Sequence, residues 1–458
     1  MLPKGEHVMN DKKQTNRFIN SSLAYALGAF ALIVPGQAFQ AFYSYFYVDK
    51  LGMAIGLFTL GRTIFTIWDA VNDPLAGMLS DRTRTRLGRR KPWLLIAAIP
   101  FSIAFFLVFA IPQGIKQNQT SLFVWFFVFL VVYETFSSIG WVNYNALLPE
   151  LFLSVRKRAN ASAVSQAFLI GGVAVATIGG PILYDKFGYA TMAGAFAILF
   201  LAVLIPFTFS FKENSDFQKE KPLSFKGAYL TTLKNRELWT FYIPNALVTA
   251  VETTLSAQIP FYAKYCLKLP DHQVALLMGA IFISIIPFVP IWSAIIKKIG
   301  AKNAWKVSFG VFALAVIPLY FAHNLIGGIA AGIAAGFGLS GWRVTPPVLN
   351  AEIIDRDALR CGQRREAMYG SIGGFLQRLS NLFLTFAFLL TSVFYGYQSG
   401  ENPGSNPDAA FRFLMSVLPF ILLLGAFLLT FLFKEAPVHQ NISQSAYNTE
   451  NNADKTVQ

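Results

Sequence analysis

Charged residues, histidine and cysteine are all scarce in this sequence. Only 14% of its 458 residues are charged, whereas soluble globular proteins have about 25%. The four histidines and two cysteines show no zinc-site spacing, and no nucleophile–base set or phosphate-binding loop accompanies them. The sequence therefore contains no set of residues typical of an enzyme active site, and we expect neither a cofactor nor a resident metal.

Apolar residues, by contrast, fill most of the chain. They make up 54% of it, and the mean hydropathy is +0.48. A helix that crosses a bilayer needs about 20 mostly apolar residues. Twelve such runs occur, at about residues 22–47, 54–79, 92–112, 121–143, 160–184, 188–211, 239–265, 271–296, 303–322, 325–345, 367–396 and 410–433. We predict an all-α integral membrane protein with twelve transmembrane helices.

The formal net charge of +14 reflects clusters of basic residues in the short connections between these runs. The connections after the second, fourth, eighth and tenth runs hold Arg82, Arg84, Arg86, Arg89, Arg90, Lys91, Arg156, Lys157, Arg158, Lys297, Lys298, Lys302, Arg356, Arg360, Arg364 and Arg365. The connection after the first run has only Lys50, and the one after the eleventh has none. This asymmetry marks the cytoplasmic side. We therefore predict that both termini are cytoplasmic, and nucleic acid is not expected as a partner.

The longest polar stretch inside the chain separates six runs from six. We expect an N-terminal six-helix bundle at 22–211, a central cytoplasmic loop at 212–238 and a C-terminal six-helix bundle at 239–433. The N-terminal segment 1–21 and the tail 434–458 are expected to be cytoplasmic, and the polar tail to be disordered. Two six-helix halves around a long loop are the layout of the major facilitator fold, whose substrate site lies near the midplane.

The stretch TIWDAVNDPLAGMLSDRTRTRLGRRKPW, at residues 66–93, begins inside an apolar run and carries two acids there. Asp69 and Asp73 are four residues apart, so a helix places both on one face. Each ionised acid costs about 2.5–3.5 kcal/mol inside the hydrocarbon. A bound cation, a proton or a basic side chain would offset that cost. We interpret the pair as a cation-binding site for H⁺ or transported Na⁺.

The loop after these acids has the signature spacing of the major facilitator superfamily. GxLxDR, at residues 77–82, is followed by GRRK at 88–91. A basic loop needed only for topology would require neither the glycines nor the acid. We expect a gating loop formed by Gly77, Asp81, Arg82, Arg89 and Arg90.

Further ionisable residues lie inside apolar runs, where such residues are usually functional; they are Arg62, Glu134, Glu252, Arg343 and Arg378. Arg62 is seven residues before Asp69, so it could simply neutralise one acid or take part in coupling. Arg378 lies too deep in its run to reach the interface, and we expect it to face the acids from the opposite half. Glu252 and Arg343 could instead lie nearer to water.

Planar polar groups and aromatic faces together are typical of sugar sites, and two runs offer both. The candidate substrate-binding residues in these runs are Gln37, Gln40, Tyr43, Glu134, Trp141 and Asn145. Aromatic stripes at helical spacing also arise from packing alone, and that interpretation stays open for the aromatic members.

Two blocks of the sequence resemble the glycoside–pentoside–hexuronide:cation symporter family, to which the melibiose permease belongs. They are IWDAVNDPLAGMLSDRTRTRLGRRKPW and, from Ala351, AEIIDRDALRCGQRREAMYGSIGGFLQRL. The similarity runs from Ser22 to Phe433. The resemblance implies that Asp69 and Asp73 are the cation-site acids and that Arg378 stands where the family usually has a lysine.

Departures from the melibiose permease fall mainly on its sugar contacts. Its first-span aspartate is replaced by Ile33, its fifth-span arginine by Gln166, and a fourth-span acid near its cation site by Trp141. We include Gln166 among the candidate substrate contacts. The family implies a sugar or glycoside, while its lysolipid-transporting animal branch leaves a lipophilic or organic-anion substrate open. The lost acid leaves fewer oxygens for Na⁺, which slightly favours protons.

These observations together predict a cation-coupled secondary active transporter, a symporter that imports a sugar or glycoside by alternating access. We expect a multi-pass protein of the plasma membrane that contacts lipid and works as a monomer. Its partners would be a small-molecule substrate and a monovalent cation. A membrane receptor without turnover and an integral membrane enzyme are the rivals from other classes.

Overall fold

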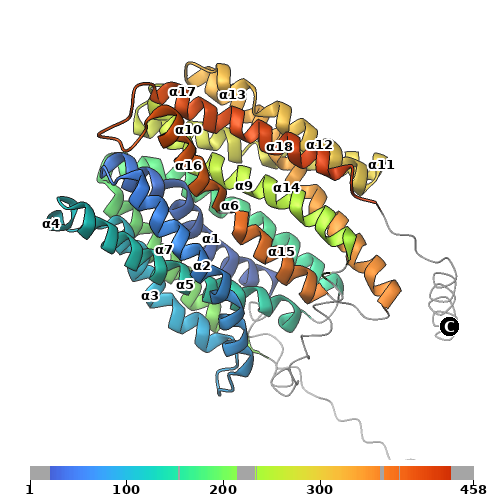
Figure 1. Cartoon of the computed structure of the whole chain (residues 1–458). Coiled ribbons are helices and arrows are strands. Elements are labelled where there is room, and N and C mark those ends of the chain that lie inside the picture. The colour runs from blue at the N-terminus through green and yellow to red at the C-terminus, as the bar shows by residue number, and fades with distance from the viewer. Residues whose placement is uncertain are drawn as a thin grey trace, which may run out of the picture.

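The computed structural model describes residues 21–152, 155–213, 233, 235–361, 366–380 and 382–434. Two side chains of the predicted sites, those of Asp73 and Asp81, are not among the described ones. The tail 435–458 and most of the expected N-terminal segment and central loop also lie outside the described residues. The described chain is built of helices and their connections (Figure 1).

The helices before the central loop pack mainly on one another, and we call them the first group. They are α1 (Ser22–Ser44), the π-helix η1 (Tyr45–Lys50), α2 (Ile55–Arg82), α3 (Lys91–Phe109), α4 (Gln113–Lys116), α5 (Gln119–Leu151), α6 (Val155–Phe187) and α7 (Tyr189–Phe209). α1 packs along α6 and α7, while α5 packs against α2 and α3.

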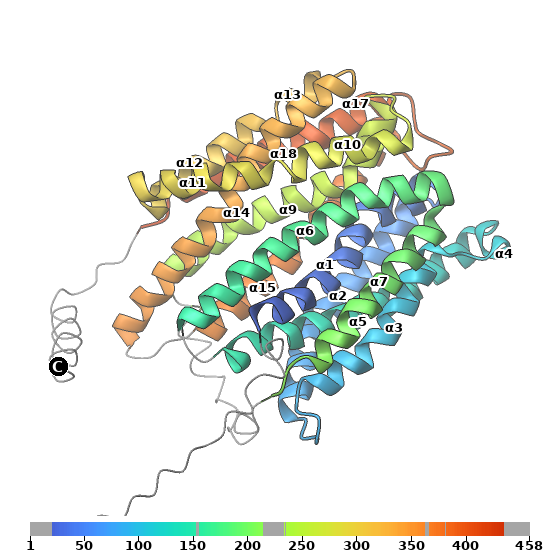
Figure 2. The ribbon, with the colours of Figure 1, turned by 180° about the vertical axis from the view of Figure 1, so that it is seen from behind.

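The helices after the central loop form the second group. They are α9 (Arg236–Tyr265), α10 (Asp271–Phe282), α11 (Ile285–Ile299), α12 (Ala301–Ala315), α13 (Pro318–Phe321), α14 (Leu325–Cys361), α15 (Glu366–Ser380), α16 (Leu382–Tyr395), α17 (Pro407–Arg412), the π-helix η3 (Phe413–Val417) and α18 (Leu418–Thr430). α14 packs against α10, α11 and α12, and α18 packs against α9 and α12. The two groups meet where α6 runs beside α10 (Figure 2) and where α1 contacts α9.

Ten helical segments among the described residues are long and apolar enough to cross a membrane. The sequence predicts twelve spans, and the two remaining runs fold as α2 and α9, which have 28 and 30 residues. Each of these helices carries some of the intramembrane charged residues, and in α2 the apolar part is the shorter segment Ile55–Thr66. Both helices fall outside the ten because polar and charged residues interrupt their apolar sequence.

Several helices begin at a residue that satisfies their free backbone N–H groups. Ser21 Oγ accepts a hydrogen bond of 3.0 Å from Ala24 N at the start of α1. The side chain of Asn118 accepts bonds of 2.8 and 3.2 Å at the start of α5, and Asn235 caps α9 in the same way at 3.0 Å. Such caps stabilise a helix by roughly 1 kcal/mol, so the polar residues between the apolar runs fix where these helices begin.

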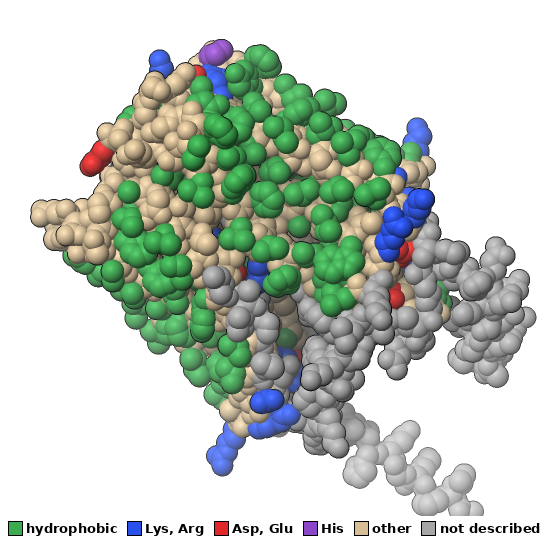
Figure 3. Space-filling view, in the orientation of Figure 1, with side chains coloured by type: hydrophobic (Ala, Val, Ile, Leu, Met, Phe, Trp, Pro, Cys, Tyr) green, Lys and Arg blue, Asp and Glu red, His purple; other side chains and the backbone are tan. Residues whose placement is uncertain are grey.

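Large apolar side chains cover the outer face of the bundle (Figure 3). Ile198 is 70% exposed and Ile96 is 57% exposed, which would be costly in water over so wide a surface. In a bilayer the same surface meets lipid, while every backbone polar group of a helix is satisfied within the helix. The surface and the helix lengths together identify a multi-pass integral membrane protein.

Candidate functional site

A cavity of about 630 Å³ lies between the two groups. α1, α2 and α5 line it on one side, and α9, α14, α15 and α16 line it on the other. Its polar lining consists of Gln37, Gln40, Tyr43, Arg62, Asp69, Glu134, Ser137, Ser138, Asn145, Thr249, Glu252, Thr253, Ser256, Arg343, Gln377 and Arg378. The sequence singles out several ionisable residues inside apolar runs. All of those whose side chains are described line this one cavity.

Asp69 and Arg378 join the two groups across this cavity. Arg378, on α15, donates from Nη1 to Oδ1 of Asp69 at 2.5 Å and to the backbone oxygen of Asp69 at 2.7 Å. The Asp69 side chain is only 13% exposed, so its charge is largely removed from water and depends on a positive partner. The structure therefore places Arg378 opposite this acid, whereas the side chain of Asp73 lies outside the described ones.

Arg62 pairs with an acid other than the nearest one in sequence. Its Nη1 donates to Oε1 of Glu134, on α5, at 3.5 Å. The guanidinium lies 5.3 Å from the ring centre of Tyr43 and 5.7 Å from that of Phe65, distances at which an aromatic face attracts a cation. The hydrogen-bond partner of Arg62 is thus Glu134, rather than Asp69, which its sequence spacing suggested.

A third pair, formed by Arg343 of α14 and Glu252 of α9, lies in the second group. The Arg343 side chain is 49% exposed, because it reaches the open part of the cavity. A second hollow of about 360 Å³ shares Arg343, Thr249 and Gln377 with the main cavity and extends along α9 and α14 to Asn350. Three arginines and three acids therefore balance in charge among the described lining residues.

Most candidate substrate residues line the cavity, and one does not. Gln37 donates a bond of 3.1 Å to Ser256 Oγ and so links α1 to α9, while Gln40, Trp141 and Asn145 are also in the lining. Gln166, on α6, is exposed outside the cavity lining. No residue of the described part of α6 lines this cavity, so the structure does not bring Gln166 together with the other candidate substrate residues, and its role as a substrate contact stays a prediction.

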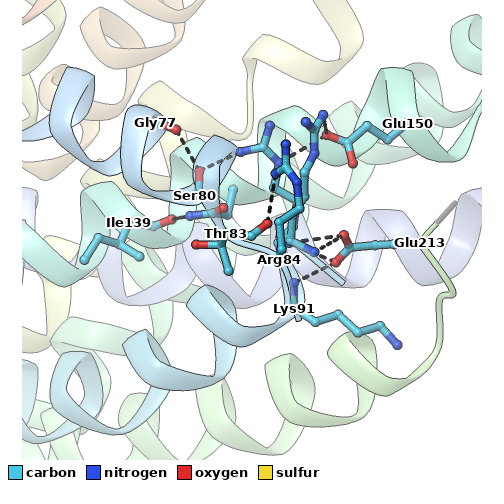
Figure 4. A network of polar contacts seen from close by, with 11 residues as sticks. Gly77, Ser80, Thr83, Arg84, Lys91, Ile139, Glu150 and Glu213 are labelled. Carbon is cyan, nitrogen blue, oxygen red and sulfur yellow. Dashed lines mark hydrogen bonds and ion pairs between the residues drawn. The ribbon is translucent and has the colours of Figure 1, made fainter. Parts of the chain in front are cut away.

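The predicted gating loop is held by two acids that sequence reasoning missed (Figure 4). Glu150, at the end of α5, accepts from Arg89 Nη2 at 2.8 Å and from Arg90 Nε at 3.1 Å. Arg90 also donates to Ser80 Oγ at 2.6 Å. These bonds tie the ends of α2 and α5 together, whereas Arg82 is exposed and the side chain of Asp81 is not described.

Glu213, the second acid that the sequence did not single out, caps the start of α3. Its carboxylate accepts from the backbone N–H groups of Arg89 at 2.6 Å, Arg90 at 3.0 Å and Lys91 at 2.8 Å. A helix N-terminus is partly positive and favours such an anion. The adjacent Gly88 has a φ of +114°, which glycine adopts readily. In the sequence, Glu150 is a lone glutamate at the end of a span, whereas Glu213 is one of several acids in the polar central stretch, so neither stands out.

At the opposite end of α2 from this loop, a buried acid, Asp49 of η1, links the two groups. Its carboxylate accepts from Lys264 Nζ at 2.6 Å, Tyr265 Oη at 2.5 Å and Tyr397 Oη at 3.3 Å. The Asp49 side chain is 0% exposed. Burial raises the pKa of the Tyr397 phenol well above its ordinary value, so this hydroxyl stays protonated and donates. Asp49 thus joins η1 of the first group to the second group.

Two further contacts join the groups near Asp49. Lys50 forms an ion pair of 2.7 Å with Asp271 at the start of α10, and the backbone N–H of Gly400 donates to Val48 O at 3.0 Å. Sequence reasoning missed this junction as well, since single charges at span ends are ordinary.

Comparison with known proteins places the chain in a transporter family. The family described as MFS/sugar transport protein matches residues 24–434. The chain belongs to this family. That membership confirms the family resemblance found in the sequence, and the protein is a transporter of the MFS/sugar transport family rather than an enzyme.

Relatives within this range are distant but span nearly whole chains. An uncharacterized symporter of Synechocystis sp. is 24% identical, covering 93% of this chain and 96% of the relative. YagG of Escherichia coli, whose name describes a glycoside/cation symporter, is 24% identical over 92% of this chain and 93% of its own. The sodium-dependent lysophosphatidylcholine symporter 1-A of Danio rerio is 22% identical, with coverages of 88% and 83%.

Solved structures show the same fold at low identity. The nucleoside transporter NupG has a TM-score of 0.62 and 14% identity, covering 90% of this chain and 99% of that one. A bacterial homologue of ferroportin in an inward-facing state has a TM-score of 0.64, with 15% identity and coverages of 90% and 98%. The chain therefore has the major facilitator fold.

Proposed function

We propose that this protein is a cation-coupled symporter that imports a sugar or glycoside by alternating access. The observation that carries the proposal is the Asp69–Arg378 pair, which links the two groups through a buried acid at the wall of a polar cavity. A cation that binds Asp69 would weaken this contact, and so would a movement of one helix group away from the other. The names of two relatives, one a glycoside/cation and one a sodium-dependent symporter, agree with such coupling.

The topology belongs to the same proposal. α2 and α9 would cross the membrane together with the ten apolar segments, which gives twelve spans, six in each group, with both termini in the cytoplasm of a plasma-membrane protein. The basic loop held by Glu150 and Glu213 would then face the cytoplasm. The junction at Asp49 would close the outer side, and the form described here would be open inward.

Coupling would follow from competition for Asp69. In the present form Arg378 occupies an oxygen of this acid, as a coupling cation would otherwise do. A proton or Na⁺ arriving from outside, with Asp73 as the second acid, would displace Arg378 and change how the two groups are held together. Moving one positive charge inward through 100 mV supplies about 2.3 kcal/mol, which is enough for roughly 50-fold accumulation of a neutral substrate.

The test is uptake of labelled substrates into proteoliposomes that hold the purified protein. We expect a glycoside to accumulate when an inward gradient of Na⁺ or protons is imposed, and not without one. The second candidate substrate is a lysolipid, supported by the similarity to the lysophosphatidylcholine symporters. Cation-driven uptake of lysophosphatidylcholine without uptake of any glycoside would replace the sugar assignment, and substrate binding without uptake would favour a receptor.

A further inference from the structure

The Arg62–Glu134 pair is held more loosely than the Asp69–Arg378 pair. Its hydrogen bond measures 3.5 Å, at the outer limit of such bonds, whereas Arg378 donates to Asp69 at 2.5 Å. In the described part of the chain, Arg62 Nε has no hydrogen-bond partner, although the side chain is only 7% exposed. The pair therefore retains hydrogen-bonding capacity at the cavity wall.

Two hydroxyl groups beside this pair are also unpartnered. Tyr43 Oη and Ser138 Oγ are buried and accept or donate no hydrogen bond to any described residue. Both residues line the same cavity as Arg62 and Glu134. The Tyr43 ring lies under the Arg62 guanidinium, and Ser138 follows Glu134 by one helical turn on α5, on the same face. Buried polar groups normally have hydrogen-bond partners. These two hydroxyl groups therefore mark a place where a ligand would supply the missing partners.

The chemistry of these groups selects a neutral ligand rich in hydroxyls. A hydroxyl both donates and accepts, so it can accept from Arg62 or Tyr43 and donate to Glu134 or Ser138. A ligand carboxylate placed near Arg62 would also lie close to the Glu134 carboxylate and be repelled by it. A ligand ammonium placed near Glu134 would likewise be repelled by Arg62. The charge balance of the whole described lining likewise gives no preference to an ion. The rings of Phe39 and Tyr133, which line the cavity nearby, stack on each other with centres 4.2 Å apart and are nearly fully buried, so they form a packed apolar wall beside these polar groups.

We propose that Arg62, Glu134, Tyr43 and Ser138 form a subsite that binds the hydroxyl groups of a neutral sugar ring. The proposal rests on the transport function proposed above and narrows its substrate class, because it disfavours organic anions and lysolipids. The subsite would replace the polar contact that Ile33 does not provide. It assigns Arg62 to substrate recognition instead of neutralisation of the cation-site acids.

The test is isothermal titration of purified protein in detergent with a fixed set of probes. Neutral probes are methyl β-D-xylopyranoside, methyl β-D-glucopyranoside, xylobiose and cellobiose, and charged or lipidic probes are glucuronate and lysophosphatidylcholine. We expect a neutral probe to bind the wild type most tightly. Its affinity should fall about 10- to 100-fold in Glu134→Gln and in Arg62→Lys, because each loses a hydrogen bond to a charged group. Ser121→Ala, an exposed change at the start of the same helix and outside the cavity lining, should alter it less than about twofold.

Three results would overturn the subsite. These are unchanged affinity in both charge variants, tighter wild-type binding of glucuronate or lysophosphatidylcholine, and failure of every neutral probe to bind the wild type. Thermal unfolding checks that each variant is folded. Where a charge variant is not folded, Tyr43→Phe, which removes only a hydroxyl, takes its place in the binding test. Symport is tested separately: a glycoside that binds through this subsite but is never accumulated under a cation gradient would refute the proposed function and leave the subsite standing.

Discussion

The junction at Asp49 gives the sharpest prediction about alternating access. Asp49→Asn keeps the size of the side chain but removes its charge and one acceptor oxygen. Three donors, including Lys264 Nζ at 2.6 Å and Tyr265 Oη at 2.5 Å, converge on this fully buried carboxylate. A buried hydrogen bond to a charged group contributes about 1.5–3 kcal/mol. Losing one such contribution should shift the equilibrium toward an outward-open form by roughly 10- to 150-fold.

Labelling of a cysteine in the cavity measures this shift. Gln40 lines the cavity, so Gln40→Cys, made in a variant with Cys266 and Cys361 replaced by serine, should be shielded from an impermeant thiol reagent added outside. Adding Asp49→Asn should accelerate labelling from outside at least tenfold. The matched control is Asp271→Asn, since the Lys50–Asp271 pair is partly exposed and such pairs contribute about 0.2–1 kcal/mol. Equal labelling rates with and without Asp49→Asn would refute the assignment of this junction as the outer closure.

Three further predictions concern coupling, the basic loop and topology. Arg378→Ala should abolish concentrative uptake while Arg378→Lys keeps part of it, because lysine retains the charge but not the fork of donors; wild-type accumulation by the alanine variant would contradict this role. Glu213→Gln should lower the thermal unfolding midpoint more than Asp271→Asn does, since it weakens three backbone bonds at the start of α3, and equal midpoints would argue against that anchor. Ser405→Cys, which is exposed in the connection before α17, should react with an impermeant thiol reagent from outside in the cysteine-free background; reaction only in inverted vesicles would reverse the orientation.

The sequence predicted the intramembrane charges and set Arg378 against the acids of the opposite half, but it did not predict the Arg62–Glu134 and Arg343–Glu252 pairs. Charges such as Glu134 and Arg343 stand out in apolar runs because each is costly there, and the structure places them at one cavity. The partners of Arg62 and Arg343 could not be read from the sequence, because each arginine meets an acid on another helix, 72 residues away for Arg62 and Glu134 and 91 for Arg343 and Glu252. Sequence spacing suggested an Arg62–Asp69 contact, whereas the fold sets Arg62 against α5.

Charges at the ends of helices were missed for the opposite reason. Asp49, Glu150 and Glu213 lie at span ends, where a charge is common and draws no attention. Their importance comes from contacts between distant segments, such as the three N–H groups at the start of α3 on Glu213. The burial of Ser399 was equally hidden, since it lies in a polar connection after α16 and yet is only 6% exposed.

The central claim is that cation entry through Asp69 drives substrate accumulation. The most direct measurement is the steady-state ratio of labelled glycoside inside and outside proteoliposomes held at about −100 mV, for the wild type and for Asp69→Asn. With one cation per sugar, the wild type should approach roughly 50-fold accumulation, which an ionophore for the driving cation collapses. Asp69→Asn should equilibrate the glycoside without concentrating it. Accumulation by Asp69→Asn equal to that of the wild type would contradict the claim.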